Sequence, residues 1–373
     1  MRKESLMNHF GVTFGEKKAI KTMSMDSDLS PHRQSQEVYS QYRLTELGKT
    51  PIKVERLRHF LKSFPNKIDA HILLDGFTNG FKVNYMGPRQ AVNCSNLISA
   101  KQHESELEEK ITKEIQAGRI AGPFKNKPFS NLRLSPIGLV AKKPPPGSKI
   151  HGWRMIQHLS YPLGSSINSF IDPQLATVQY TSFDKVLGTI SKLGKGAEMA
   201  RMDIVSAFRL LILHPDEFVL FGFRFQDNFY FQKALPMGCS AACALFEKFS
   251  CFLEWLVRFQ SHKESIEHYL DDFLLAGEAR SGECLHLMNN FRTICSDIGV
   301  PLAEEKTLGP TCIMTFLGLE IDTLEMVIRI PQDKLTEVKG KLELTIKKRK
   351  ITLRDLQSLV GSLKFLCYAY KGH

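Results

Sequence analysis

Two adjacent carboxylates form the strongest candidate for a chemical site in this sequence. Asp271 and Asp272 follow Tyr269 and Leu270, and the four residues lie between two apolar segments. Because neighbouring side chains of a regular strand point to opposite faces, both acids can serve one site only at the tip of a hairpin. Their negative charges would repel each other there, and bound cations would offset that repulsion. The alternative is a solvated turn.

Asp203 supplies a third carboxylate. It lies in RMDIVSAF, an apolar-flanked segment typical of the end of a buried strand. Carboxylate oxygens suit Mg2+, and two such ions about 4 Å apart can activate an attacking hydroxyl and stabilise a leaving pyrophosphate. In-line phosphoryl transfer needs mainly positioning and charge compensation. The residues predicted to be catalytic and to bind two Mg2+ ions, for which Mn2+ can substitute, are Asp203, Asp271 and Asp272.

Composition indicates a globular protein with a polyanionic partner. The chain has 373 residues, a hydrophobic fraction of 43%, and 50 Lys and Arg against 39 Asp and Glu, which gives a net charge of +11. This excess favours nucleic acid, although charge alone does not separate DNA, RNA and an anionic membrane. No uncharged apolar run approaches the roughly 18 residues of a spanning helix, and the first residues lack the apolar core of a secretory signal. We expect no membrane partner and an intracellular location, in the cytoplasm, the nucleus or both.

Cysteine spacing argues against a zinc module. The eight cysteines include no C-x-x-C pair accompanied by a second pair or by spaced histidines. Cys239, Cys243 and Cys251 fall in one segment rich in small residues, and we interpret them as packing residues of a helix. A metal or redox role for them is the less favoured alternative.

Apolar spacing predicts the elements that position the acids. Upstream they are helices at 54–64 and 104–116, a hairpin of 134–143 with 153–159, a hairpin in FGFRFQDNFYFQ that turns at Asp227 and Asn228, a helix at 240–259, and two short strands that meet at the acidic pair. Downstream they are a helix at 282–298 that buries Leu285, Met288, Phe291 and Cys295, a hairpin of TFLGLEID with MVIRI across Asp322 and Thr323, and two helices, the last capped by Thr352.

The order of several motifs resembles the palm of reverse transcriptases. RMDIVSAF, LPMGCSAACALFEKF, HYLDD, the EEK at 304–306 and TFLGLEID follow one another as they do in that family, and LVAKKPPPGSKIHGWRMI is similar to its fingers hairpin. The resemblance covers roughly residues 100–370. LPMGCS and ALFEKF are most similar to retrotransposons of the DIRS or tyrosine-recombinase type, with the gypsy type second.

The resemblance implies an α+β right-hand polymerase fold with fingers, an antiparallel-sheet palm and a helical thumb. It implies fingers and palm at 100–330, and the thumb with the start of a connection at 331–373. Before them we expect a mobile N-terminal arm at 1–48, because that segment is rich in Ser, Lys, Gln and Met without a sustained period, and an N-terminal extension at 49–99. The sequence ends at KFLCYAYKGH, just past the thumb, which leaves no room for a ribonuclease H, protease or recombinase module. We therefore expect this chain to lack those activities.

Roles follow from the resemblance residue by residue. Asp203 and Asp271 would bind both metal ions, and Asp272 would be a weaker ligand. Phe208 matches the aromatic position beneath the incoming sugar. Arg154 matches the arginine placed against the triphosphate, joined by Lys142, Lys143 or Lys149. The alternatives are a core aromatic for Phe208 and a solvated surface for the basic residues.

Further roles are implied around the nucleotide and the primer. Gly238 would allow close approach of the template or nucleotide, or else form a tight strand-to-helix turn. Met237 stands where retroviral enzymes carry glutamine, which puts a polar contact to the sugar in doubt. Lys306 would protonate or screen the leaving pyrophosphate, or else be a surface lysine. The residues assigned to primer and template are Tyr269, Gly318 and Leu319, the last two in a hairpin that is otherwise simply packed.

The implied function is that of an RNA-directed DNA polymerase, which transfers nucleotides from dNTPs to a primer 3′-hydroxyl on an RNA or DNA template. The basic run at 347–350 would lie along the duplex backbone or be a solvated face. One alternative is a catalytically silent, truncated or host-adopted nucleic-acid binder. Others are an RNA-templated RNA polymerase, which the aromatic Phe208 disfavours, and a structural RNA-binding scaffold.

Overall fold

A computed structural model of the protein describes residues 44–142, 152–348 and 350–370. Most of the predicted arm at 1–48 therefore lies outside the described residues. Glu46–His373 forms one compact unit, and the boundaries predicted inside it, after residues 99 and 330, stay predictions. Among the described helices, none is both long and apolar enough to cross a membrane.

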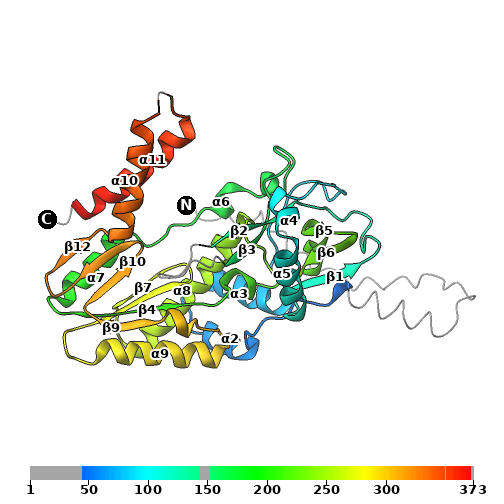
Figure 1. Ribbon diagram of the computed structural model, residues 1–373. Helices are drawn as coiled ribbons and strands as arrows, with labels where there is room; N and C mark the ends of the chain where they lie inside the picture. The colour runs from blue at the N-terminus through cyan, green and yellow to red at the C-terminus, as the bar shows by residue number, and fades with distance from the viewer. Residues whose placement is uncertain (1–43, 143–151, 349, 371–373) are drawn as a thin grey trace, which may run out of the picture. The chain divides into compact units, whose positions relative to one another are not determined.

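A four-stranded antiparallel sheet carries the predicted acids (Figure 1). In spatial order its strands are β7 (Ile266–Tyr269), β8 (Asp272–Gly277), β4 (Glu198–Asp203) and β9 (Leu308–Thr311). Leu274 lies on one face, in a buried cluster with residues of α7 (Phe183–Leu193). Phe273 lies on the other face and contacts Phe291 of α9 (Glu283–Ile298) with 4.7 Å between ring centroids. Because side chains alternate along a strand, Asp272 shares the face of Leu274.

Helix α8 (Ala241–Ser261) confirms the helix predicted at 240–259 and forms much of the core. Its buried aromatic side chains pack against aromatic side chains of the N-terminal segment. Phe249 contacts Phe77 of α3 (Lys67–Asn79), and Phe252 contacts Phe64, which follows α2 (Val54–Leu61). Burial of such rings removes a large apolar area from water, which stabilises the packing of these helices.

The predicted upstream hairpins are present. β2 (Ile137–Ala141) pairs antiparallel with β3 (Trp153–Gln157), and a second sheet has the order β1 (Ile120–Phe124), β6 (Asn228–Gln232), β5 (Gly222–Phe225). The turn between β5 and β6 was predicted one residue too late, since Phe225 pairs with Asn228 and the turn residues are Gln226 and Asp227. Gln226 adopts the positive φ of +51° that a two-residue hairpin turn requires. The remaining elements upstream of α8 are α4 (Ile98–Gln102), α5 (Glu104–Gln116), α6 (Pro173–Ala176) and the short 3-10 helices η1 (Asn168–Phe170), η2 (Ala207–Leu210) and η3 (Pro215–Leu220).

The C-terminal part contains one turn that was not predicted. TFLGLEID is itself a hairpin, because β10 (Ile313–Phe316) and β11 (Leu319–Asp322) pair across Leu317 and Gly318. Both turn residues have positive φ, +49° and +83°, as a type I′ turn requires. The predicted hairpin with MVIRI is also present, because β11 pairs with β12 (Val327–Arg329). Its turn was placed too early, since Asp322 still pairs with Val327 and the connecting residues are 323–326. The sheet is followed by α10 (Gln332–Ile346) and α11 (Leu353–Tyr370), and the 3-10 helix η4 (Glu304–Lys306) precedes β9.

Two details of the predicted helices are settled by packing. In α9, Leu285 was expected to be buried but is 49% exposed, while Leu287 is fully buried. The helix turns by 3.6 residues, so a face read at a strict spacing of three drifts away from the core. At α11 the predicted cap is confirmed, since the Asp355 backbone N–H donates to the Thr352 hydroxyl at 3.1 Å.

Candidate active site

The three predicted acids lie at one end of the central sheet. Asp203 closes β4 and is paired in register with Asp272, the first residue of β8. Leu270 and Asp271 form the two-residue turn between β7 and β8. Leu270 has a φ of +55°, a conformation that costs a leucine about 1 kcal/mol or more. The strand pairs on both sides hold this turn, which frees Asp271 from the alternation of the strands.

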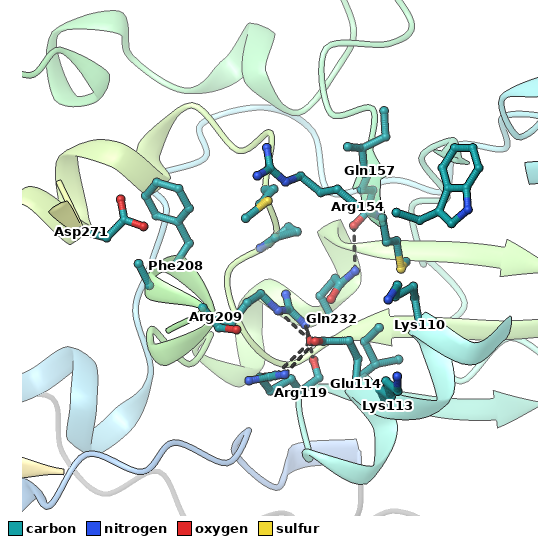
Figure 2. A pocket seen from close by; sticks show the side chains of 18 of the residues that line it. Lys110, Lys113, Glu114, Arg119, Arg154, Gln157, Phe208, Arg209, Gln232 and Asp271 are labelled. Carbon is teal, nitrogen blue, oxygen red and sulfur yellow. Dashed lines mark hydrogen bonds and ion pairs between the residues drawn. The ribbon is translucent and has the colours of Figure 1, made fainter. Parts of the chain in front are cut away.

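Asp203 and Asp271 line one cavity of about 440 Å³. Figure 2 shows Asp271 among the residues that line it. Asp203 is only 7% exposed. Asp272 is not among the described residues that line the cavity, and its carboxylate accepts a hydrogen bond from Arg201 Nε at 2.7 Å. The structure therefore brings two of the three acids to the cavity and pairs the third with a guanidinium beside it.

Electrostatics at this end of the sheet favour a bound cation. Burial raises the pKa of Asp271, and the negative charge of Asp203 raises it further. Burial likewise raises the pKa of Asp272 to about 6, against the opposing effect of Arg201. Lys306 Nζ donates to Asp203 Oδ1 at 2.8 Å and partly compensates the site. A cation between Asp203 and Asp271 would relieve the cost of holding both carboxylates ionised.

The donor set fits a hard divalent ion. Asp203 and Asp271 present carboxylate oxygens to the same cavity, and such oxygens are the ligands that Mg2+ prefers. The three aspartates do not form one tight cluster, because their ligand atoms do not all lie within 4.8 Å of one another in the described structure. The two residues that would hold Mg2+ are therefore Asp203 and Asp271, while Asp272 lies outside the described lining of the cavity.

Several positively charged side chains line the same cavity as the acids. Arg154 projects from β3 and makes no hydrogen bond or ion pair with another described residue (Figure 2). Burial lowers the pKa of Lys142, and the positive charges of Arg154, Lys110 and Lys306 lower it further. Cationic donors gathered in this way suit a polyphosphate. Lys110 was not predicted, although it lies on the polar side of the predicted helix at 104–116.

Phe208 and Met237 form the apolar part of the lining. Phe208 is half-buried on η2, and its ring meets the buried ring of Phe246 edge to face, with 5.6 Å between centroids. Met237 is half-buried on the loop that precedes α8. Phe208 thus lines the cavity and also packs toward the core, and its place beneath the incoming sugar stays a prediction.

A hydrogen-bonded network that the sequence did not predict links three residues that line the cavity. Arg209 Nε donates to Glu114 Oε2 at 2.9 Å, and Arg209 Nη1 donates to the backbone carbonyl of Ala234 at 2.8 Å. Arg119 donates to both carboxylate oxygens of Glu114, at 2.7 and 2.9 Å (Figure 2). Burial alone would raise the pKa of Glu114, but the Arg209 and Arg119 charges outweigh it and lower that pKa. Glu114 and Arg209 are 95 residues apart in the chain, so neighbouring sequence gave no signal for their contact.

Gly238 and Tyr269 lie beside the cavity lining. Gly238 has a φ of +102°, its carbonyl accepts from Asn168 Nδ2 at 2.8 Å, and a Cβ there would meet the Gln157 carbonyl oxygen at 2.8 Å. The tight turn before α8 is therefore present, and the close approach of template or nucleotide to Gly238 stays a prediction. Tyr269 packs against Tyr180, with 4.7 Å between ring centroids.

The remaining predicted contacts are spread more widely. Gly318 lies in the turn of the β10–β11 hairpin, but Leu319 is 1% exposed, so a primer contact by its side chain is wrong. The apolar packing of β11 explains this burial. Lys143 and Lys149 lie outside the described residues, as does Arg349 of the basic run. The described lysines of that run, Lys347, Lys348 and Lys350, are exposed.

Comparisons with known proteins agree with this geometry. Residues 140–321 match the family "Reverse transcriptase (RNA-dependent DNA polymerase)". The genome polyprotein of Petunia vein clearing virus is 30% identical over 134 residues in both the Shepherd and the Hohn isolate, a match that covers 36% of this chain and 6% of the polyprotein. The chain thus spans only a small part of these curated relatives.

Solved structures of the foamy viral protease-reverse transcriptase share the fold. The form in complex with an RNA/DNA hybrid is 19% identical with a TM-score of 0.53, over 86% of this chain and 41% of that one. A form in complex with double-stranded DNA is 17% identical with a TM-score of 0.55, over 86% of this chain and 63% of that one. The fold is that of a right-hand polymerase, and residues 140–321 match a reverse transcriptase domain with viral relatives.

Proposed function

We propose that this chain is an RNA-directed DNA polymerase, which adds deoxynucleotides to the 3′-hydroxyl of a primer on an RNA or DNA template. One observation carries the proposal: Asp203 and Asp271 line the same cavity as the cationic side chains of Arg154 and Lys142. Acids at one end suit metal ions, and cations at the other suit the triphosphate of a dNTP.

Five of the residues that line the cavity have a part in this reaction. When bound, Mg2+ would stabilise negative charge on the attacking and the leaving oxygens. Asp203 and Asp271 would hold the ions, while Arg154 offers its planar donors to the triphosphate. Phe208 would lie under the deoxyribose. Lys306 is beside Asp203, where its ammonium can screen or protonate the leaving pyrophosphate.

Partners and origin follow from the same proposal. The foamy viral structures contain an RNA/DNA hybrid or double-stranded DNA, and we infer that this chain takes a template-primer duplex as well. Its basic net charge of +11 supports a polyanionic partner. LPMGCS and ALFEKF support a retroelement of the DIRS type, with the gypsy type second, and a protein of this kind would act inside the cell, in the cytoplasm, the nucleus or both.

Primer extension on an RNA template tests this function directly. The purified chain with Mg2+ and four dNTPs should extend a DNA primer annealed to RNA and to DNA, and a chelator should abolish the products. A matched reaction with Asp271→Asn controls for contaminating polymerases. Duplex binding without extension by the wild-type chain would favour the silent nucleic-acid binder instead.

A further inference from the structure

A second group of metal-ligand side chains lies on the opposite face of the central sheet. Glu247 and Cys251 are four residues apart on α8, so they project from the same side of the helix. His268 of β7 faces them. It is paired in register with Phe273, whose side chain lies on the α9 face of the sheet rather than on the face of Asp203.

The ligand atoms of these three residues converge. Glu247 Oε1, Cys251 Sγ and His268 Nε2 all lie within 4.8 Å of one another. Nε2 is 3.2 Å from Oε1 and 3.9 Å from Sγ. Zinc binds nitrogen at about 2.0 Å and sulfur at about 2.3 Å, so two ligands of a tetrahedral ion lie roughly 3.3 to 3.7 Å apart. The 3.2 Å between Nε2 and Oε1 is close to that range, and Sγ would have to move about 0.2 to 0.6 Å toward Nε2 to share an ion with it.

A fourth side chain orients the histidine. Glu254, on the same face of α8, forms a very short hydrogen bond with His268 Nδ1. That bond leaves Nε2 pointing at Cys251 and Glu247. A carboxylate on one ring nitrogen and a metal on the other is the usual environment of zinc-binding histidines, because the carboxylate fixes the ring and makes it more basic.

Two more features match a binding site. Glu247 Oε2 is buried and has no hydrogen-bond partner among the described residues, which is costly unless another group satisfies it. Cys251 is exposed, so an ion can enter from solvent and a water molecule can complete its coordination. The cluster is separate from the candidate active site, since none of its residues lines that cavity.

We propose that Glu247, Cys251 and His268 bind one Zn2+ ion, with Glu254 as the residue that orients His268. A thiolate, an imidazole and a carboxylate form a borderline-soft ligand set, which selects zinc over Mg2+. The expectation that the cysteines hold no zinc considered spacing along the chain only, whereas these ligands meet across α8 and β7.

Zinc at this position would join α8 to β7, the strand that leads into the turn of Asp271. Binding must release the thiol proton of Cys251 and any proton on His268 Nε2, as metal binding to such ligands does. In the metal-free protein, burial opposes a charge on His268, but its hydrogen bonds to Cys251, Glu247 and Glu254 raise its pKa to about 11. Without zinc, His268 bridges Glu254 and Glu247 through its two ring nitrogens.

Zinc binding by the full chain tests the proposal. Chelator-treated protein dialysed against Zn2+ with excess Mg2+ should retain one Zn2+ per chain, and Co2+ in its place should show a thiolate charge-transfer band. Cys251→Ser should lower zinc affinity at least about tenfold and remove the band, and Glu254→Gln should weaken binding by about 10 to 100-fold. Cys367→Ser is the matched control, because Cys367 is also an exposed thiol.

Two further measurements keep the outcome clear. Asp271→Asn should bind zinc as the wild type does, which separates this site from the polymerase site even if the chain extends no primer. Zinc should also raise the Tm of the wild type and not that of Glu247→Gln, which tests the site if Cys251→Ser folds poorly. Equal zinc content in wild type and Cys251→Ser, or a band that only Cys367→Ser removes, would overturn the proposal.

Discussion

At the scale of single residues, Phe208 bears on sugar choice. Its ring faces the cavity and is supported from behind by Phe246. A 2′-hydroxyl above such a ring would lose its water without gaining a partner. An apolar wall alone rejects an added hydroxyl only about 100-fold, so rigid support by Phe246 matters for stronger exclusion.

We predict that Phe208→Val raises ribonucleotide incorporation relative to deoxynucleotide by at least about tenfold, equal to roughly 1.4 kcal/mol of lost discrimination. The measurement is kcat/KM for matched dNTP and rNTP. Phe259→Val, which truncates an exposed ring on α8, is the control and should leave the ratio unchanged. An unchanged ratio in an active Phe208→Val enzyme would mean that Phe208 only packs the core.

Arg154 bears on triphosphate binding. A charge-assisted bond contributes about 1.5 to 3 kcal/mol, so Arg154→Ala should raise the KM for dNTP by about 10 to 100-fold. Lys195→Ala removes an exposed charge away from the cavity and should leave KM unchanged. Steady-state kinetics on one template-primer checks this. Equal KM values for Arg154→Ala and wild type would remove Arg154 from the nucleotide site.

At the scale of elements, Glu114 joins α5 to η2 through Arg209. Its pKa is lowered in the folded protein, so its ionised form stabilises the fold at pH values above its unfolded pKa. That stabilisation is lost as the pH falls through the folded pKa. The acid limb of the stability curve should therefore depend on this residue.

Glu114→Gln should lower the free energy of unfolding by about 2 kcal/mol at pH 7, and this difference should shrink as the pH falls from about 5 to 3. Denaturant unfolding at several pH values measures it. Glu108→Gln, at an exposed position of the same helix, should track the wild type at every pH. A difference that is constant with pH would show that Glu114 acts through packing and not through its charge.

The segment between α10 and α11 carries the basic run at 347–350. If its lysines neutralise duplex phosphates, neutral replacements at Lys347, Lys348 and Lys350 should reduce the salt dependence of template-primer affinity. The log-log slope should fall by about 0.9 for each phosphate that the chain no longer neutralises. Affinity measured at several salt concentrations gives the slope. The same three replacements with an unchanged slope would identify the run as a solvated face.

At the scale of the whole molecule, local pattern predicted much of the fold. The acidic hairpin was predictable because strand alternation and two apolar flanks are local, and the cap at Thr352 was predictable for the same reason. The left-handed turn at Leu317 was not, since a leucine rarely adopts positive φ and only the pairing of β10 with β11 imposes it.

Contacts between distant segments explain the parts of the site that sequence did not predict. Arg201 pairs with Asp272 across two strands, and Lys110 reaches the cavity from a helix whose apolar side alone is evident in sequence. Glu247 and His268 meet because α8 packs on β7. Residue types and order identified the acids, but only the fold decides which cations face them.

The central claim is that Asp203 and Asp271 carry catalysis as metal ligands. Incorporation of a single nucleotide on a primer annealed to RNA, at saturating duplex with Mg2+, tests it most directly. Asp203→Asn and Asp271→Asn should each slow the step at least about 1000-fold while duplex binding and Tm stay close to wild type, and Asp272→Asn should slow it less. Incorporation at the wild-type rate by Asp203→Asn or Asp271→Asn would contradict the account.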